Sequence, residues 1–94
     1  MESLKKEVEK SIYEFLKLNK KKDKTEDDLS RINNSTLLIE DGYLDSIKLV
    51  ELLTTLESKY SIEILDYEDF DVEHVRTIDS IVNLVITIKS NKKV

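Results

Sequence analysis

The chain has 94 residues, a net charge of −5, no cysteine, no proline and a single glycine. A chain of this length forms one small domain with a modest hydrophobic core. The lack of cysteine excludes disulfides, thiolate nucleophiles and cysteine metal sites, and it is compatible with a reducing compartment. Because residues that break helices are so scarce, the composition favours an all-α domain.

The charge is unevenly distributed along the chain. Residues 26–79 carry fifteen acidic and four basic side chains, whereas the segments on either side each have a net charge of +3. Such an acidic centre disfavours nucleic acid and favours partners with basic protein surfaces. No apolar run is long enough to span a bilayer, and the charged first ten residues do not resemble a signal peptide. We therefore expect a cytoplasmic monomer.

The first predicted helix runs from about Ser3 to Leu18. Ser3 is the expected N-cap, and the lysines that follow the helix suit the negative end of its dipole. Apolar residues recur at helical spacing on one face of this segment: Leu4, Val8, Ile12 and Phe15.

A long polar connection is expected between residues 19 and 44. Its apolar stretch, Leu37 to Ile39, should attach it to the core, because a connection of this length needs internal packing. Asp41 and Gly42 could form a hairpin turn, but the following segment is too short for a strand, so a plain turn is preferred.

The second predicted helix begins at Asp45 or Ser46 and ends near Tyr60. Asp45 is a good N-cap, since its carboxylate can accept hydrogen bonds from the first turn. With an advance of about 100° per residue, the apolar residues form one core-facing stripe. This stripe consists of Leu49, Leu52, Leu53, Leu56 and Tyr60.

The last part of the chain should contain a short helix and a longer one. We expect one or two helical turns between residues 65 and 75, with four side chains packed inward: Tyr67, Phe70, Val72 and Val75. Thr77 should cap a final helix from Ile78 to about Lys89. The β-branched run "IVNLVITI" could instead form a strand, although it has no obvious partner.

Together these elements predict a small four-helix bundle with three longer helices, a short third helix and a long first loop. Residues 1–94 should form a single domain, with an ordered core at about 3–89 and a flexible tail at 90–94.

The start of the second predicted helix combines two features. Ser46 lies at the N-terminal tip, where unpaired N–H groups and the helix dipole favour an anion such as a phosphate. Ile47, Val50 and Thr54 fall far from the core stripe, and Glu51 and Glu57 lie at their edges. This surface is a docking patch with an acidic border, an incidental exposed surface, or a surface that packs under the long loop.

Other chemistry has little support in the sequence. His74 is the only histidine, which argues against a catalytic triad or a zinc site. The acidic residues from 63 to 73 lack the glycine and the terminal glutamate of a calcium loop, so a solvated acidic face is expected instead. No constellation of catalytic groups indicates an enzyme.

The segment "GYLDSIKLVELLTTLESKY" resembles the signature of acyl and peptidyl carrier proteins, in which an Asp-Ser-Leu/Ile motif opens the second of four helices. The long first loop, the "SIEI" after the helix and the short acidic third helix are also similar. The resemblance implies that Ser46 bears 4′-phosphopantetheine, attached from coenzyme A by a phosphopantetheinyl transferase. The thiol of that arm would hold an acyl or aminoacyl group as a thioester, and the protein itself would not be an enzyme. Asp45 would orient the junction for the transferase.

The resemblance also implies roles for the surface beside Ser46. Ile47, Val50 and Thr54 match positions at which carriers touch partner enzymes, and Glu51 and Glu57 match acidic positions that meet basic residues there. The implied partners are the transferase and an adenylating ligase, acyl transferase or synthase.

Three departures from the carriers of fatty-acid synthesis bear on the identity of the cargo. Leu44 precedes the motif, Lys48 occupies a place that is usually acidic, and no proline follows "IEI". These differences are more similar to discrete carriers of specialised pathways. The segments "LDS" and "EDFDVEHVRT" together resemble D-alanyl carrier proteins and other stand-alone aminoacyl or acyl carriers that an adenylating enzyme loads. Fatty-acid, polyketide and nonribosomal biosynthesis all stay open as pathways. The alternative from another class is an unmodified helical adaptor that binds a partner through Ile47 and Val50.

Overall fold

The computed structural model describes residues 2–19, 24–67 and 70–91, and within them every regular element is helical. The elements are α1 (Glu2–Leu18), α2 (Glu26–Ser30), α3 (Ser46–Tyr60), the 3-10 helix η1 (Val72–Val75) and α4 (Ile78–Asn91). The predicted all-α bundle is confirmed: α1, α3 and α4 are its three longer helices, and η1 is the short one that precedes the last. None of the helices in these ranges is both long and apolar enough to cross a membrane.

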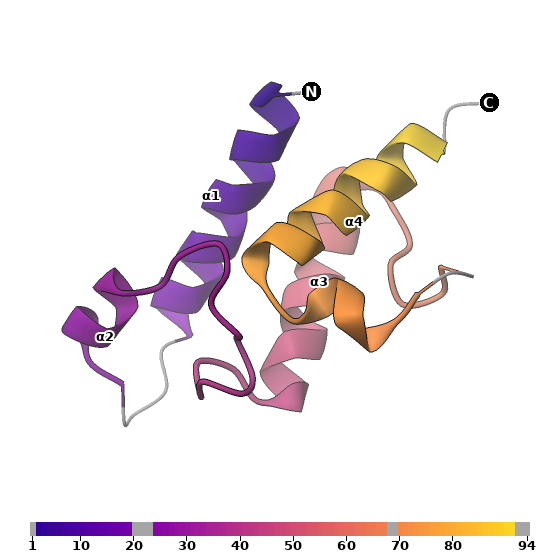
Figure 1. The fold of residues 1–94 in the computed structure, drawn as a ribbon. Coiled ribbons are helices and arrows are strands. Elements are labelled where there is room, and N and C mark those ends of the chain that lie inside the picture. Colours follow the sequence, from indigo (N-terminus) through magenta and orange to yellow (C-terminus); the bar gives the residue numbers. More distant parts are fainter. Residues whose placement is uncertain (1, 20–23, 68–69, 92–94) are drawn as a thin grey trace.

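The three longer helices enclose the core. α1 packs against both α3 and α4, and α4 also packs against η1. Figure 1 shows α2 standing to one side, beside the C-terminal half of α1, with the connection from α2 returning across the molecule to reach α3. The fully buried side chains of the longer helices include Val8, Ile12, Leu52, Leu56, Ile78, Ile81, Val82 and Val85.

Two helix ends differ from the prediction. α1 already begins at Glu2, so Ser3 lies inside its first turn and the prediction that Ser3 is the N-cap is wrong. α4 continues through Asn91, two residues beyond the expected end at Lys89. The rest of the predicted tail, residues 92–94, lies outside the described residues. The strand alternative for "IVNLVITI" is wrong, because this run is helical and buries residues at helical spacing.

α2 lies within the predicted connection and was not expected. Its start is a capping box: Asp28 N–H donates to the Thr25 hydroxyl over 3.1 Å, and Thr25 N–H donates to the Asp28 carboxylate over 2.9 Å. The bond from Thr25 N–H is the main reason why the pKa of Asp28 is lowered. Five residues are too few to show an apolar periodicity, so only the pattern of Thr25 and Asp28 could have indicated this helix.

Only some of the apolar side chains in the segment before α4 pack against the core. Val75 is buried, and Tyr67 and Phe70 are partly buried against the core. Val72 is 65% exposed, so the prediction that it packs inward is wrong. η1 has only four residues, and the end that leads into α4 is the one that reaches the core.

Leu38 attaches the long connection to the rest of the molecule. Its side chain is completely buried, and its N–H donates to the carbonyl of Arg76 over 2.9 Å. Its own carbonyl accepts from the N–H groups of Tyr43 and Leu44, at 2.9 and 3.0 Å. Of the three residues expected to attach the loop, only the middle one is buried, since Leu37 is half-buried and Ile39 is 41% exposed.

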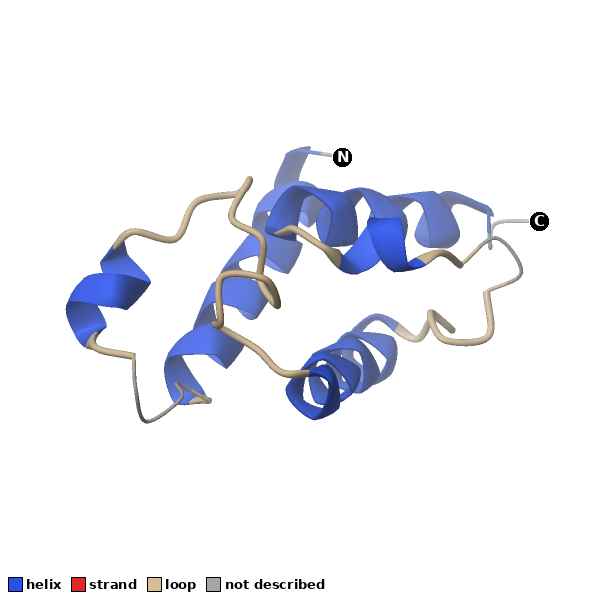
Figure 2. Cartoon of the chain, turned by 60° about the horizontal axis from the view of Figure 1, so that its bottom comes forward, coloured by secondary structure: helices blue, strands red, loops and turns tan. Residues whose placement is uncertain are grey.

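The predicted turn at Asp41 and Gly42 is confirmed. Gly42 adopts φ +84°, a conformation that side chains disfavour, and its N–H donates to the Ile39 carbonyl over 3.0 Å. Farther back in the connection, the Asn34 carbonyl accepts from Asp79 N–H in the first turn of α4. Figure 2 shows this loop passing from α2 to the N-terminal end of α3. The path of the connection is therefore fixed at several points before it enters α3.

The burial of Leu38 generates a stability prediction. Leu38→Ala should lower the free energy of unfolding by about 2–4 kcal/mol, because it leaves a cavity between the loop and the core. Ile39→Ala, at the exposed neighbouring position, should cost no more than about 1 kcal/mol. Urea unfolding followed by circular dichroism measures both values. Equal costs for the two variants would contradict the anchoring role of Leu38.

Candidate functional site

The N-terminus of α3 is capped by Asp45. The backbone of Asp45 is extended, its Oδ1 accepts from Lys48 N–H over 2.8 Å, and its carbonyl accepts from Leu49 N–H over 2.9 Å. The structure thus places Asp45 in the N-cap position that the sequence predicts. These two hydrogen bonds stabilise the first turn of α3, in which Ser46 is the first residue.

Ser46 is the first residue of α3, and its side chain is exposed. No hydrogen bond is made by its hydroxyl within the ranges that the structure describes. The N–H groups of Ser46 and Ile47 belong to the first turn, so they have no acceptor within the helix. An accessible hydroxyl therefore lies beside two unpaired donors at the positive end of a 15-residue helix.

The turn that leads into α3 is held by a buried side chain and by contacts with residues 24–28. Leu44 is buried directly before the motif. The Tyr43 hydroxyl donates to the carbonyl of Asp28 over 3.1 Å, and Lys24 Nζ lies 4.7 Å from the centre of the Tyr43 ring. Lys24 Nζ also donates to the Asp41 carbonyl. These contacts give the unexpected helix α2 a role, because they join it to the turn that leads into α3.

One face of α3 carries apolar side chains that the core does not cover. Ile47 is 70% exposed and Val50 is 47% exposed, whereas Leu52, Leu53 and Leu56 are buried on the opposite side. Thr54 is exposed on the same face as Ile47, and its hydroxyl donates to the Val50 carbonyl over 2.7 Å. We call Ile47, Val50 and Thr54 the α3 patch. Its use as a docking surface stays a prediction.

The two acidic residues beside the α3 patch have different surroundings. Glu51 is exposed and pairs with Lys48 at 3.2 Å, while Lys48 Nζ also donates to Asn19 Oδ1. Glu57 is half-buried, and its Oε2 accepts from the N–H groups of Ile64 and Leu65, at 2.7 and 3.0 Å. Sequence spacing did not reveal this second role, because it depends on how residues 62–65 fold back on α3. The contact of Glu57 with partners stays a prediction.

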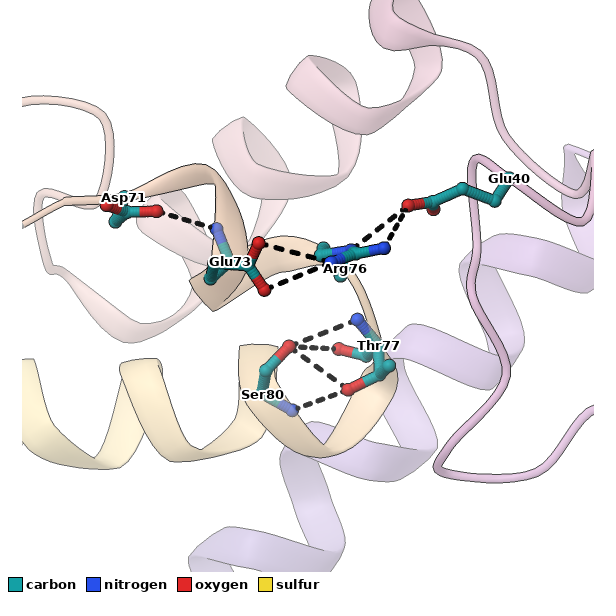
Figure 3. A network of polar contacts seen from close by, with 6 residues as sticks. All are labelled: Glu40, Asp71, Glu73, Arg76, Thr77 and Ser80. Carbon is teal, nitrogen blue, oxygen red and sulfur yellow. Dashed lines mark hydrogen bonds and ion pairs between the residues drawn. The ribbon is translucent and has the colours of Figure 1, made fainter.

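A hollow of about 250 Å³ lies between α3, η1 and the connection. We call it the α3–η1 hollow; its lining residues are Ile39, Glu40, Leu49, Val72, Glu73, Val75 and Arg76. At its polar side the Arg76 guanidinium pairs with Glu40 at 2.7 Å and with Glu73 at 3.1 Å (Figure 3). Backbone hydrogen bonding and the Arg76 guanidinium hold the pKa of Glu40 below its ordinary value. No local pattern around Arg76 in the sequence indicates its contact with Glu40.

His74 has a structural contact rather than a place in this site. Its Nδ1 accepts from Asp71 N–H over 3.2 Å and so completes the cap of η1. No group of three or more histidine or acidic side chains in the described part of the chain is arranged to hold a metal ion.

Comparison with known proteins adds a second line of information. The chain is 37% identical to an acyl carrier protein of Chlamydia caviae over 60 residues. The matched region covers 64% of this chain and 74% of that relative. It is 32% identical over 85 residues to an acyl carrier protein of Buchnera aphidicola, which covers 90% of this chain and 94% of that relative. The chain belongs to the acyl carrier protein family.

Membership in the acyl carrier protein family agrees with the resemblance in the sequence and makes the chain a carrier protein. The acyl carrier protein of Chlamydia felis is a third such relative, at 37% identity over 60 residues. No family model matches the chain, and no solved structure matches it significantly. The subtype, whether similar to D-alanyl carriers or belonging to another specialised pathway, stays a prediction.

The cap of α3 can be tested in this carrier protein. Asp45→Ala should lower the free energy of unfolding by about 1 kcal/mol, because the Lys48 N–H loses its acceptor. Asp45→Asn keeps an acceptor oxygen and should stay close to the wild type. Urea unfolding of the three proteins provides the comparison. If Ala and Asn cost the same, the Oδ1 bond does not stabilise the helix end.

Proposed function

We propose that this protein carries an acyl or aminoacyl group as a thioester on a 4′-phosphopantetheine arm attached to Ser46. The observation that supports the attachment point most strongly is the exposed Ser46 hydroxyl beside two unpaired backbone donors at the start of α3. Family membership supports the class of function. Under this proposal the arm comes from coenzyme A through a phosphopantetheinyl transferase.

The residues of the chain suit a phosphodiester at Ser46. A transferred phosphate would lie within reach of the N–H groups of Ser46 and Ile47, at the end of the helix that favours negative charge. Asp45 holds the first turn through Lys48 N–H, so the donors keep their direction. The arm supplies the thiol that this cysteine-free chain lacks, and the reactions on the cargo belong to the partner enzymes.

The α3 patch supports the second half of the proposal, which concerns partners. Ile47 and Val50 offer apolar contact next to Ser46, and Glu51 and Glu57 add negative charge near them. A partner with an apolar contact inside a basic rim would match this surface, and opposite charge would speed the encounter. The transferase and an adenylating ligase, acyl transferase or synthase are the proposed partners, and the carrier acts as a cytoplasmic monomer.

The attachment is tested by mass. The purified protein is incubated with coenzyme A and a broad-specificity phosphopantetheinyl transferase, and its intact mass is measured. We expect a gain of one phosphopantetheine in the wild type and none in Ser46→Ala. Ser58→Ala is the matched control, since Ser58 is an exposed serine on the same helix, and it should gain the full mass. A wild type that gains no mass would favour the unmodified adaptor.

The docking role is tested with Val50→Asp. The change should leave the fold nearly intact, because Val50 is half exposed, but it should lower kcat/KM for the transferase about tenfold, the loss of about 1.4 kcal/mol of contact energy. Thr55→Asp places the same charge at an exposed site of α3 outside the patch and should have a much smaller effect. Equal kinetics for the two variants would remove the docking role of the patch.

A further inference from the structure

Arg76, the residue that follows η1, joins the long connection to the segment between η1 and α4. Its Nε and Nη2 donate to Glu40 Oε2 at 3.0 and 2.7 Å, and its Nη1 donates to both carboxylate oxygens of Glu73 at 3.2 and 3.1 Å. Its backbone carbonyl accepts from Leu38 N–H over 2.9 Å. One residue therefore holds the connection at two positions, Leu38 and Glu40, and ties it to η1. We call these contacts the Arg76 clamp.

The start of α4, which directly follows Arg76, is held by local hydrogen bonds. Thr77 and Ser80 cap the start of α4 directly after Arg76, because Ser80 N–H donates to Thr77 Oγ1 and Thr77 N–H donates to Ser80 Oγ, both over 3.1 Å (Figure 3). Ile78, which follows Thr77 and begins α4, is completely buried. The backbone of Arg76 is thus fixed by the first turn of α4, and the loop is the part that the clamp positions.

The clamped loop leads directly to the attachment serine. Glu40 is followed by the turn at Asp41 and Gly42, then by the buried Leu44 and the cap Asp45. The two N–H groups that close this turn, those of Tyr43 and Leu44, donate to the carbonyl of Leu38, whose own N–H is held by Arg76. A short series of hydrogen bonds therefore links Arg76 to the residues at the entry into α3.

We propose that Arg76 is a positioning residue for Ser46, which sets the pose of the loop that presents the serine to the transferase and to the partner enzymes. This inference rests on the proposed attachment at Ser46. An arginine suits the role because its planar fork of donors engages two carboxylates at once and fixes their geometry. Both pairs are partly exposed, so the effect concerns loop position more than global stability.

The chain offers a matched control for an ordinary surface ion pair. Arg31 pairs with Asp27 at 2.9 Å, but the two residues are one turn apart and both side chains are largely exposed. Removing this guanidinium breaks a pair of similar length without releasing one segment from another. Arg31→Gln therefore shows what the loss of an exposed arginine does by itself.

The test compares Arg76→Gln, Arg76→Lys and Arg31→Gln with the wild type in two measurements. Amide hydrogen exchange follows the N–H groups of Leu38, Tyr43 and Leu44, and modification kinetics with coenzyme A and the transferase give kcat and KM separately. In Arg76→Gln we expect exchange at these amides to be about fivefold faster and kcat about fivefold lower, as the loss of weak ion pairs allows. KM should change little, because the α3 patch is intact, and exchange in the core of α4 should not change.

Arg76→Lys should recover part of the lost kcat, since an ammonium keeps the charge but cannot grip both carboxylates in the same way. Arg31→Gln should match the wild type in both measurements. If the wild type is modified and Arg76→Gln behaves like Arg31→Gln, or if its loop exchanges faster while kcat is unchanged, the positioning role is overturned and the proposed function stands. If the wild type is not modified at all, the proposed function itself fails.

Discussion

The anchoring of Leu38 is the constraint on which the rest of the site depends. Its buried side chain, its N–H on Arg76 and its carbonyl on Tyr43 and Leu44 fix the end of a long polar connection against the start of α4. Without this anchor, residues 33–44 would have few apolar contacts with which to offset the entropy of ordering the chain. With it, the connection arrives at α3 along a defined path, and Asp45 and Ser46 occupy fixed positions at the helix tip.

The function that we propose uses what a helix end offers in any protein. The first-turn N–H groups of α3 need acceptors, Asp45 supplies one for Lys48, and those of Ser46 and Ile47 stay available for a phosphate. Beside this tip, Ile47 and Val50 are exposed because the core needs only the opposite face of the helix. The proposed attachment point and the proposed contact surface thus both lie on one amphipathic helix, which the loop before it leads into.

Much of this arrangement could be predicted from the sequence because the signals are local. The bounds of α3 follow from the cap at Asp45 and from a leucine stripe at helical spacing, and both depend only on neighbouring residues. The same holds for the turn at Gly42. Within α3, periodicity also predicted correctly which apolar side chains the core would leave exposed.

Two of the features that the sequence did not reveal depend on partners that are distant along the chain. Glu40 and Arg76 are 36 positions apart, so nothing in the local pattern of either residue indicates the clamp. Glu57 caps Ile64 and Leu65 only because the chain reverses after α3. Val72 fits an inward pattern by hydropathy, yet a helix as short as η1 brings only one of its ends to the core.

The most direct test of the account is to locate the modification at the level of single residues. After reaction with coenzyme A and a phosphopantetheinyl transferase, the protein would be digested and the peptide containing the start of α3 fragmented in a mass spectrometer. We predict that all of the added phosphopantetheine is on Ser46 and none on Ser58 or Ser61. Finding the group on another serine, or on none, would contradict it.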